Sequence, residues 1–475
     1  MAVGASAETS ATRELAAGAV GPVRVVAFGT SIVAPAASVV AYLVLVLAFA
    51  GFASPLVVVI TFAASLCCAL SISEFARRVP SAGWAYTYNS RGLGRTGGFL
   101  TGWMMVFGYA LFVPAAIGLT SAFLSLLLAS TLHVTIAGWL LFLVIAAAMA
   151  VVAYLGIRTS AAFDVILVAG EMAVIAALAI TVLIKAGPAH FSAAAFSPAS
   201  SPNHRLTDIT DAMIYGITAF AGFEAAAALG EEARDTRRSV PIGMVAIVVV
   251  SGVFYLLVVC AEVFGVGRAG IAGFLQRGSQ LGYLAGRYWS PSVMWLVDLV
   301  IVLAGLGFVI ATVNAGTRVL FAMGRDRVLP PALSRLSDRR TPVVAIGCLT
   351  VLALALGLPL TAAYGGVRTF GYLGGAAGLA VVLVYTAVNI AVIRAFRTEF
   401  RDEFSVWRHL LIPALAIVVF LFPLWGTIFP GPYTLMNVLP FIALGWLLVG
   451  AIVAAAVLRK RPEPAEPAEL PVEER

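Results

Sequence analysis

Charged residues are scarce in this chain of 475 amino acids. They make up 11% of it, whereas hydrophobic residues make up 61%; soluble globular proteins average about 25% and about 45–50%. So few charged side chains leave the surface of a soluble protein of this size uncovered, which disfavours a water-soluble enzyme. Several uninterrupted apolar runs exceed the roughly 20 residues that cross a hydrocarbon layer of about 30 Å as a helix. The sequence therefore predicts a polytopic membrane protein.

Cysteine and histidine are also rare, with four residues of each. The four cysteines lie within apolar runs, and the adjacent pair among them faces different sides of a helix, so neither a disulfide framework nor a metal cage is predicted. No histidine stands in a metal-ligand pair, and the polar cluster of a nucleophilic triad is missing. The GxGxxG string at Gly92–Gly97 follows no strand, which argues against a dinucleotide site. We expect no enzyme activity, no metal and no cofactor. The four cysteines are Cys67, Cys68, Cys260 and Cys348.

A partner that is a nucleic acid is not expected either. The formal charge is +7, but the basic residues sit in short loops between apolar runs and form no basic domain. The partners that the sequence predicts are the lipid bilayer and a small molecule, and it leaves the oligomeric state open.

The apolar runs predict an all-α fold of twelve transmembrane helices within one membrane domain, residues 23–458. Continuously apolar runs of this length exclude a membrane barrel. Residues 1–22 lack the pattern of a signal peptide, so we expect them to form a loose segment before a retained first span. Residues 459–475 are rich in Pro and Glu and are predicted to be disordered. The predicted spans are 23–49, 54–76, 98–128, 135–155, 161–185, 209–231, 241–266, 292–323, 342–362, 368–395, 408–428 and 434–458.

The distribution of Lys and Arg predicts the orientation of these spans. Of the 30 basic residues, 24 fall in the N-terminal segment, the even-to-odd loops and the C-terminal tail. Cytoplasmic loops carry an excess of Lys and Arg, so both termini are predicted to be cytoplasmic in a cell membrane. The six basic residues on the opposite side are Lys185, Arg205, Arg268, Arg277, Arg287 and Arg368.

Two of the predicted spans contain breaks. The first span has Gly, two hydroxyl residues and Pro between Gly29 and Pro35, and in the sixth span Gly216 and Gly222 bracket Phe220. Corresponding breaks in the first and sixth of ten core spans are typical of two inverted repeats of five helices. Broken helices offer N–H groups to a carboxylate and carbonyl groups to an ammonium. The alternative is that Gly and Pro only permit kinks and close packing.

Carboxylates within spans are candidates for function, because they are costly inside a membrane. Glu224 follows the break in span six, and Glu171 lies near the middle of span five; both could take and release protons. The alternatives are that Glu224 caps the broken helix locally and that Glu171 is a structural hydrogen-bonding partner. Asp298 and Glu262 lie nearer the outer ends of their spans, where we expect solvated structural roles.

Three further polar residues are candidates for the wall of the same cavity. Thr312 and Asn314 lie in span eight and Tyr109 lies in span three. For the first two residues, a hydrogen bond between packed helices is an equal alternative, and for Tyr109 the alternative is aromatic packing.

Three segments resemble the amino acid–polyamine–organocation superfamily of transporters. They read PSAGWAYTYNSRGLGRTGGFLTGW from Pro80 to Trp103, FAGFEAAAALGEEARDTRRSVP from Phe220 to Pro241, and TRVLFAMGRDRVLPPALSRLSDRRTP from Thr317 to Pro342. Each is similar to a family signature at the matching span, and the resemblance extends over the whole membrane domain. It implies a LeuT-type fold, with two inverted repeats of five helices and two peripheral helices, and uptake or exchange of amino acids or related amines.

The resemblance also implies a substrate site. In the family, the broken regions of spans one and six hold the substrate's carboxylate and amine, and spans three, eight and ten complete the pocket. The family's glutamate after a Gly-Phe pair corresponds to Glu224, and Phe220 corresponds to an aromatic gate. Carried over to this chain, the candidate substrate-binding residues are Gly29, Thr30, Ser31, Ala34, Pro35 and Ala36 in span one, and Ile217, Ala219, Phe220 and Gly222 in span six, with Tyr109 and Asn314 beside them.

Two departures from the family pattern keep alternatives open. Many members have a Gly-Ser-Gly type break in span one, whereas this chain has GTSIVAPAAS from Gly29 to Ser38, which leaves room for an amine substrate. Some proton-coupled members place a Lys near the position of Glu171. We expect a proton-coupled or exchanging amino acid permease with Glu224 and Glu171 in proton coupling; sodium, held by Thr312 and carbonyl groups of span one, remains an alternative.

Other classes fit the sequence less well. A polyamine permease of the same fold is the second hypothesis. A non-transporting amino acid sensor would often carry a soluble signalling domain, which the chain lacks. A major-facilitator type transporter usually has a long loop between spans six and seven, whereas only about ten residues, 231–240, separate them here.

Overall fold

The computed structural model describes residues 26, 29–30, 33–78, 84–156, 161–224, 236–325, 327–428 and 438–458. All regular structure in these ranges is helical, and they contain no strand. The terminal segments predicted to be loose or disordered, 1–22 and 459–475, and the candidate residue Ser31 lie outside the described residues.

The described helices are those of a polytopic membrane protein. Nine of them are long and apolar enough to cross a membrane, and Pro440–Ala456 is a shorter apolar helix. One of the nine, Pro35–Arg78, has 44 residues, about twice what a bilayer requires. It holds two predicted spans, because Gly51 (φ 55°, ψ −127°) ends α3 (Val44–Ala50) before η2 (Gly51–Ala53) and α4 (Ser54–Arg78).

The remaining helices overlap the predicted apolar runs, although α5 begins before its run and α8 ends within its run. They are α5 (Trp84–Leu132), α6 (Gly138–Leu155), α7 (Ala161–Ala186), α8 (Leu206–Thr218), α10 (Thr236–Val266), α13 (Met294–Arg325), α14 (Val343–Leu352) continued by η9 (Ala353–Gly357) and α15 (Leu358–Tyr364), α16 (Gly366–Thr398), η11 (Trp407–Leu411) continued by α17 (Ile412–Ile428), and α18 (Leu439–Leu458). Short helices fill several connections: η3 (Pro188–His190), η4 (Ala193–Phe196), η5 (Pro198–Ser200), η6 (Arg268–Gly270), α11 (Ile271–Leu275), α12 (Gln280–Tyr288), η7 (Pro291–Val293), η8 (Pro331–Ser334) and η10 (Arg401–Glu403).

The third helix differs from its prediction. The sequence places a cytoplasmic loop before residue 98, but α5 begins at Trp84 and bends at Gly94, whose backbone (φ 82°, ψ 176°) is not helical. The GxGxxG string therefore lies on a kinked helix. Arg91, one turn before the kink, forms an ion pair with Glu399 at the end of α16, so this polar segment is held against the protein as a helix.

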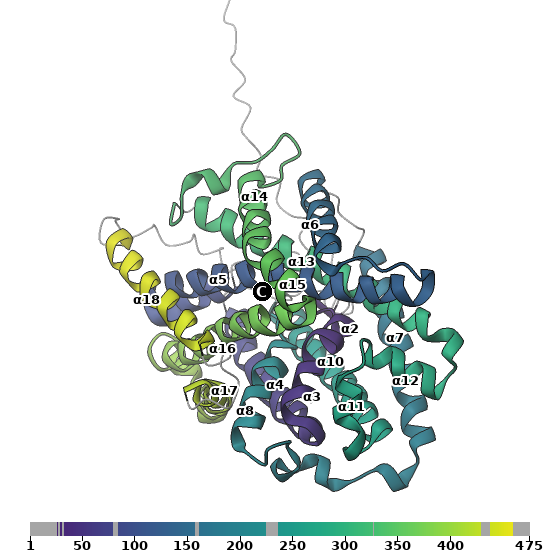
Figure 1. The fold of residues 1–475 in the computed structure, drawn as a ribbon. Helices are drawn as coiled ribbons and strands as arrows, with labels where there is room; N and C mark the ends of the chain where they lie inside the picture. The colour runs from purple at the N-terminus through teal and green to yellow at the C-terminus, as the bar shows by residue number, and fades with distance from the viewer. Residues whose placement is uncertain are drawn as a thin grey trace, which may run out of the picture.

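The centre of the molecule is formed by α5, α13 and α16, with α4 packed along α10 beside them (Figure 1). The approach of α5 to α16 is close because glycines meet there: a Cβ on Gly366 would stand 1.9 Å from the carbonyl oxygen of Gly118. Helices α6, α14 and α18 lie at the periphery (Figure 1), and their outer faces carry exposed apolar side chains such as Val144, Val351 and Leu448. Apolar faces of this kind suit contact with lipid.

Candidate functional site

The predicted break in the first span is present. Ala34 has a left-handed backbone (φ 46°, ψ 65°), and Pro35 then opens α2 (Pro35–Ser38), which continues through η1 (Val39–Leu43), a π-helical turn, into α3. Proline fits the first position of a helix and disfavours the helical conformation in the residue before it. A left-handed alanine costs about 1 kcal/mol, and such strain is typical of functional sites.

The sixth span is interrupted as well. Helix α8 ends at Thr218, and residues 219–224 form successive turns, with Gly222 at φ 111°. Two contacts fix these turns. The Tyr255 hydroxyl donates to the Ala219 carbonyl oxygen over 2.7 Å, and the Gly222 N–H donates to Oε2 of Glu224 over 2.9 Å. The second contact joins Glu224 to the break, as its alternative role of pairing locally would require.

A cavity of about 110 Å³ lies beside both breaks. Its described lining comes from five segments, which are the first, third, sixth, eighth and tenth of the predicted spans. The lining residues are Val33, Ser38 and Tyr42; Met104, Met105, Gly108, Tyr109 and Phe112; Thr218, Ala221, Gly222 and Glu224; Phe308, Ala311, Thr312 and Ala315; and Ala380, Val381, Val384 and Tyr385.

The cavity wall is apolar apart from a few hydroxyl groups and one carboxylate. Glu224 is the one charged side chain among the described lining residues, and it is 8% exposed. Its Oε2 accepts a second hydrogen bond, over 2.7 Å, from the hydroxyl of Tyr385 on α16. The Tyr385 carbonyl in turn accepts from Nδ2 of Asn389 over 2.8 Å. Two neutral donors therefore position this carboxylate: the Gly222 N–H within the break and the Tyr385 hydroxyl on α16.

The structure brings together some of the predicted site residues and not others. Tyr109, Gly222 and Glu224 line the cavity, as does Thr312. In span one, Ala34, Pro35 and Ala36 lie between two lining residues, Val33 and Ser38, while Gly29 and Thr30 lie in the segment before the break. Ile217 and Ala219 are buried at the end of α8 and the start of the turns.

Three predicted residues lie away from the described cavity lining. Phe220 stacks on Phe62 (ring centroids 6.0 Å apart) and meets Tyr255 edge-on, so its ring packs behind the break. Asn314 is exposed, two residues after Thr312 on another face of α13. Glu171 is buried on α7, which packs against α2.

Two expectations about carboxylates were wrong. Glu262 and Asp298 were predicted to be solvated, but both are buried. Asp298 accepts from the Ser279 hydroxyl over 2.5 Å, because the short helix α12, which the sequence analysis missed, covers it. Within the described residues, neither carboxylate oxygen of Glu262 has a hydrogen-bonding partner.

Sequence reasoning also missed residues that line the cavity. Tyr385 and Ser38 contribute hydroxyl groups, and Tyr42 packs its ring against Phe370 and Phe308. A single tyrosine or serine within a long apolar run carries no local signal of function. The faces of α5 and α16 that approach span six become known only once the helices are packed.

Comparison with known proteins identifies the family. The sequence profile described as amino acid permease matches residues 26–454. The chain belongs to the amino acid permease family. The resemblance read from the sequence is thereby confirmed, and the protein is a transporter rather than an enzyme. It is a membrane protein whose substrate is a small molecule.

Relatives of this permease have different substrates in their names. It is 26% identical over 420 residues to the branched-chain amino acid permease BcaP of Bacillus subtilis, covering 85% of each chain. It is 25% identical over 341 residues to the low-affinity putrescine importer PlaP of Escherichia coli, covering 69% of this chain and 70% of the importer. An uncharacterised transporter of Mycobacterium tuberculosis is 30% identical over 334 residues, or 68% of each chain.

The fold of the permease is shared by a solved transporter structure. The manganese transporter of Eremococcus coleocola superimposes with a TM-score of 0.58 at 12% sequence identity, over 92% of this chain and 94% of that one. At this identity the likeness concerns the fold alone.

Proposed function

We propose that this permease is a secondary active transporter that moves amino acids across the cell membrane by alternating access. In this proposal twelve membrane helices form two inverted repeats of five and a peripheral pair, with both termini in the cytoplasm. Helix packing supports the repeats. Four of the five corresponding pairs are in contact in the structure, α3 with α8, α4 with α10, α5 with α13, and α6 with α14, and the breaks fall in the first member of each repeat.

The observation that carries the proposal is the placement of Glu224. It faces a cavity beside the two breaks whose described wall is otherwise formed by apolar side chains and a few hydroxyl groups. A substrate ammonium would be attracted to this carboxylate, and the helix that starts at Pro35 would direct its positive end toward the substrate carboxylate. The apolar walls from α5, α13 and α16, among them Met104, Phe308 and Val384, would then receive the substrate side chain. Amino acids with apolar side chains fit this arrangement best.

We propose proton coupling through Glu224, with Glu171 as a second proton carrier. Intramembrane carboxylates are typical proton relays of transporters. Among the described residues, Glu224 is in no ion pair, so a proton or a cationic group is free to neutralise it. A sodium site at Thr312 is the alternative: its hydroxyl donates to the Phe308 carbonyl oxygen over 2.7 Å, which leaves the lone pairs of the hydroxyl oxygen available to a cation.

One observation favours a second function, import of amines or polyamines. The described cavity lining includes a carboxylate but no Lys, Arg or His, which suits a substrate that is cationic and has no carboxylate of its own. The putrescine importer among the relatives is consistent with this function.

Uptake into proteoliposomes separates these functions. A panel of labelled apolar, polar and cationic amino acids and of diamines would be offered with and without an inward proton gradient, and with a sodium gradient in parallel. We expect uptake of apolar amino acids that the proton gradient accelerates. The Glu224→Gln variant should lose this uptake, whereas Glu399→Gln, which alters a half-exposed carboxylate outside the cavity, should retain it.

The other outcomes are equally informative. Uptake of diamines alone would assign the second function. Acceleration by sodium and not by protons would contradict the proposed coupling. If no compound is taken up by vesicles in which the orientation of the protein has been verified, the proposed substrate class is wrong.

A further inference from the structure

A second crevice lies away from the transport cavity, where the end of α4 meets the start of α10. Its volume is about 670 Å³, and its described lining consists of Arg77, Arg78, Arg238, Glu403 and Ile242. Three guanidinium groups thus face one crevice with a single carboxylate. We propose that this crevice binds the phosphate headgroup of an anionic membrane lipid. The proposal concerns binding only and does not rest on the proposed transport function.

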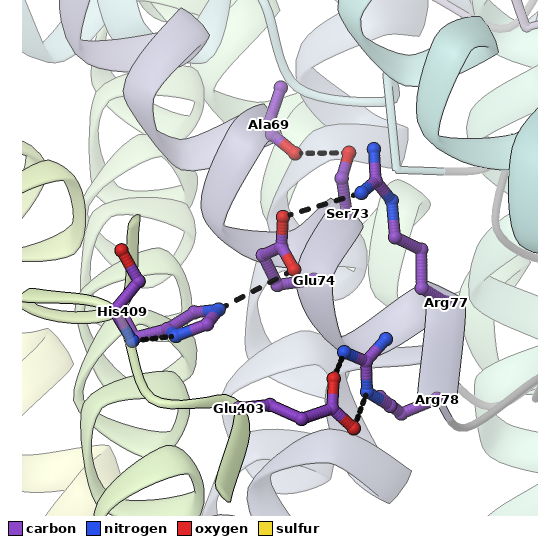
Figure 2. Close-up of polar contacts among 8 residues, drawn as sticks. Ala69, Ser73, Glu74, Arg77, Arg78, Glu403 and His409 are labelled. Carbon is purple, nitrogen blue, oxygen red and sulfur yellow. Dashed lines mark hydrogen bonds and ion pairs between the residues drawn. The ribbon is translucent and has the colours of Figure 1, made fainter. Parts of the chain in front are cut away.

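The carboxylate of the crevice is already engaged. Nε of Arg78 donates to Oε1 of Glu403 over 3.0 Å, and a second guanidinium nitrogen contacts Oε2 (Figure 2). This two-pronged pairing is the geometry that arginine and carboxylate prefer. It neutralises Arg78 and Glu403 together, and it leaves Arg77 and Arg238 as the cationic groups of the crevice.

The next carboxylate, Glu74, lies one helical turn before Arg77 and Arg78 on α4 and is held by His409. The Ser405 N–H donates to Nδ1 of His409 over 2.9 Å, so the proton of the neutral ring is on Nε2. Nε2 lies 3.4 Å from Oε2 of Glu74 and donates to it. The His409 ring is kept in this position by stacking on Phe396, with ring centroids 3.7 Å apart.

Arg77 is consequently only loosely paired. Its guanidinium nitrogen is 3.7 Å from Oε1 of Glu74, beyond the roughly 2.7–2.9 Å of a direct charged hydrogen bond. Figure 2 shows Glu74 lying between Arg77 and His409. Within the described residues, Nε of Arg77 has no hydrogen-bonding partner although the atom is buried. An acceptor with several oxygens, such as a phosphate, would satisfy donors of this kind.

The position of Ile242 indicates that the phosphate belongs to a lipid. Ile242 lies one helical turn after Arg238 on α10 and is 48% exposed. It begins the apolar part of a membrane helix, so an exposed side chain there contacts acyl chains. Guanidinium groups directly beside such a residue lie at headgroup depth. Basic residues at the cytoplasmic surface attract anionic lipids, and the charge distribution of the sequence predicts that this end of α4 and α10 is cytoplasmic.

The test compares lipid retention by purified variants of the full chain. Wild-type protein, the double variant Arg77→Gln/Arg238→Gln, and the control Arg318→Gln/Arg394→Gln would be titrated in detergent with phosphatidylglycerol or phosphatidylcholine. Bound lipid would be counted by native mass spectrometry. The control removes two exposed arginines that do not line the crevice.

We expect wild type and control to bind phosphatidylglycerol in preference to phosphatidylcholine. The crevice variant should bind phosphatidylglycerol about twenty-five-fold more weakly, since each of the two basic residues near an anionic membrane surface contributes about fivefold. Thermal unfolding of each variant without lipid verifies that it is folded.

Three results would overturn the proposal. Equal binding of phosphatidylglycerol by the crevice variant and the control would show that these arginines do not hold the lipid. Equal binding of both lipids by wild type would show that the crevice has no preference for an anion. If inorganic phosphate at millimolar concentration stabilises wild type but not the crevice variant, while phosphatidylglycerol does not bind, the site takes a soluble anion.

Discussion

The hydrogen bond between Tyr385 and Glu224 allows a quantitative test of the site. Tyr385→Phe removes a hydroxyl that donates to Oε2 of Glu224 over 2.7 Å. The two side chains are 1% and 8% exposed, so the bond is shielded from bulk water. A hydrogen bond to a charged group contributes about 1.5–3 kcal/mol, and one between neutral groups about 0.5–1.5 kcal/mol. We therefore expect Tyr385→Phe to lower the free energy of unfolding by about 1.5–3 kcal/mol at a pH at which Glu224 is ionised.

A double-mutant cycle isolates the charged part of this bond. In a Glu224→Gln background, the Tyr385 hydroxyl meets a neutral amide, so Tyr385→Phe should cost only about 0.5–1.5 kcal/mol. The difference, about 1–1.5 kcal/mol, is the coupling energy between the two positions. The assay is equilibrium unfolding in mixed detergent micelles, followed by tryptophan fluorescence, which does not require that the variants transport.

Tyr255→Phe is the matched control for this cycle. Its hydroxyl donates over 2.7 Å to the carbonyl oxygen of Ala219 in the same break, and this acceptor is neutral. We expect its cost to be the same in both backgrounds. Equal costs for Tyr385→Phe in both backgrounds would refute the reasoning, because the hydroxyl would then not be recognising a charged carboxylate.

Two further predictions concern glycines. Gly108→Ala should raise the KM of large apolar amino acids more than that of small ones, because its Cβ enters the cavity wall 3.7 Å from the Cβ of Ala380. It should also raise the thermal unfolding temperature, because alanine favours a helix by about 1 kcal/mol relative to glycine. An unchanged ratio of the KM values for large and small amino acids would contradict the first expectation. Gly366→Ala should lower the unfolding temperature, because its Cβ would stand 1.9 Å from a backbone oxygen of α5. Gly347→Ala, whose Cβ meets nothing within 4 Å, should not lower it. Equal changes in unfolding temperature for the two variants would contradict the close contact between α5 and α16.

The breaks could be predicted from the sequence because they depend on backbone chemistry that single residues carry. Pro35 fits the first position of a helix, and Gly222 adopts a positive φ that other residues rarely adopt. The presence of a carboxylate at the break, Glu224, could likewise be predicted from the sequence. The apolar runs located the helices for a similar reason, since membrane spans follow from the length and hydropathy of a local window.

What the sequence did not predict depends on packing between distant segments. The third span was predicted to begin at residue 98, but the stretch before it is helical, with Arg91 paired to Glu399, 308 residues away in the chain. Asp298 looked accessible because nothing local indicates that α12 covers it. Tyr385 lies 161 residues from Glu224, and no pattern within α16 distinguishes it from a tyrosine that only packs.

The structure also changes the choice that the sequence posed for Glu224, between capping the break and meeting the substrate. Its Oε2 accepts from both the Gly222 N–H and the Tyr385 hydroxyl, and two donors occupy the two lone pairs of one oxygen. Under the proposed function, a substrate ammonium would bind Oε1, which leaves both donors in place, or would displace one of them. In the second case substrate binding would loosen either the break in span six or its bond to α16. A single carboxylate would then connect occupancy of the cavity to movement of the helices around it.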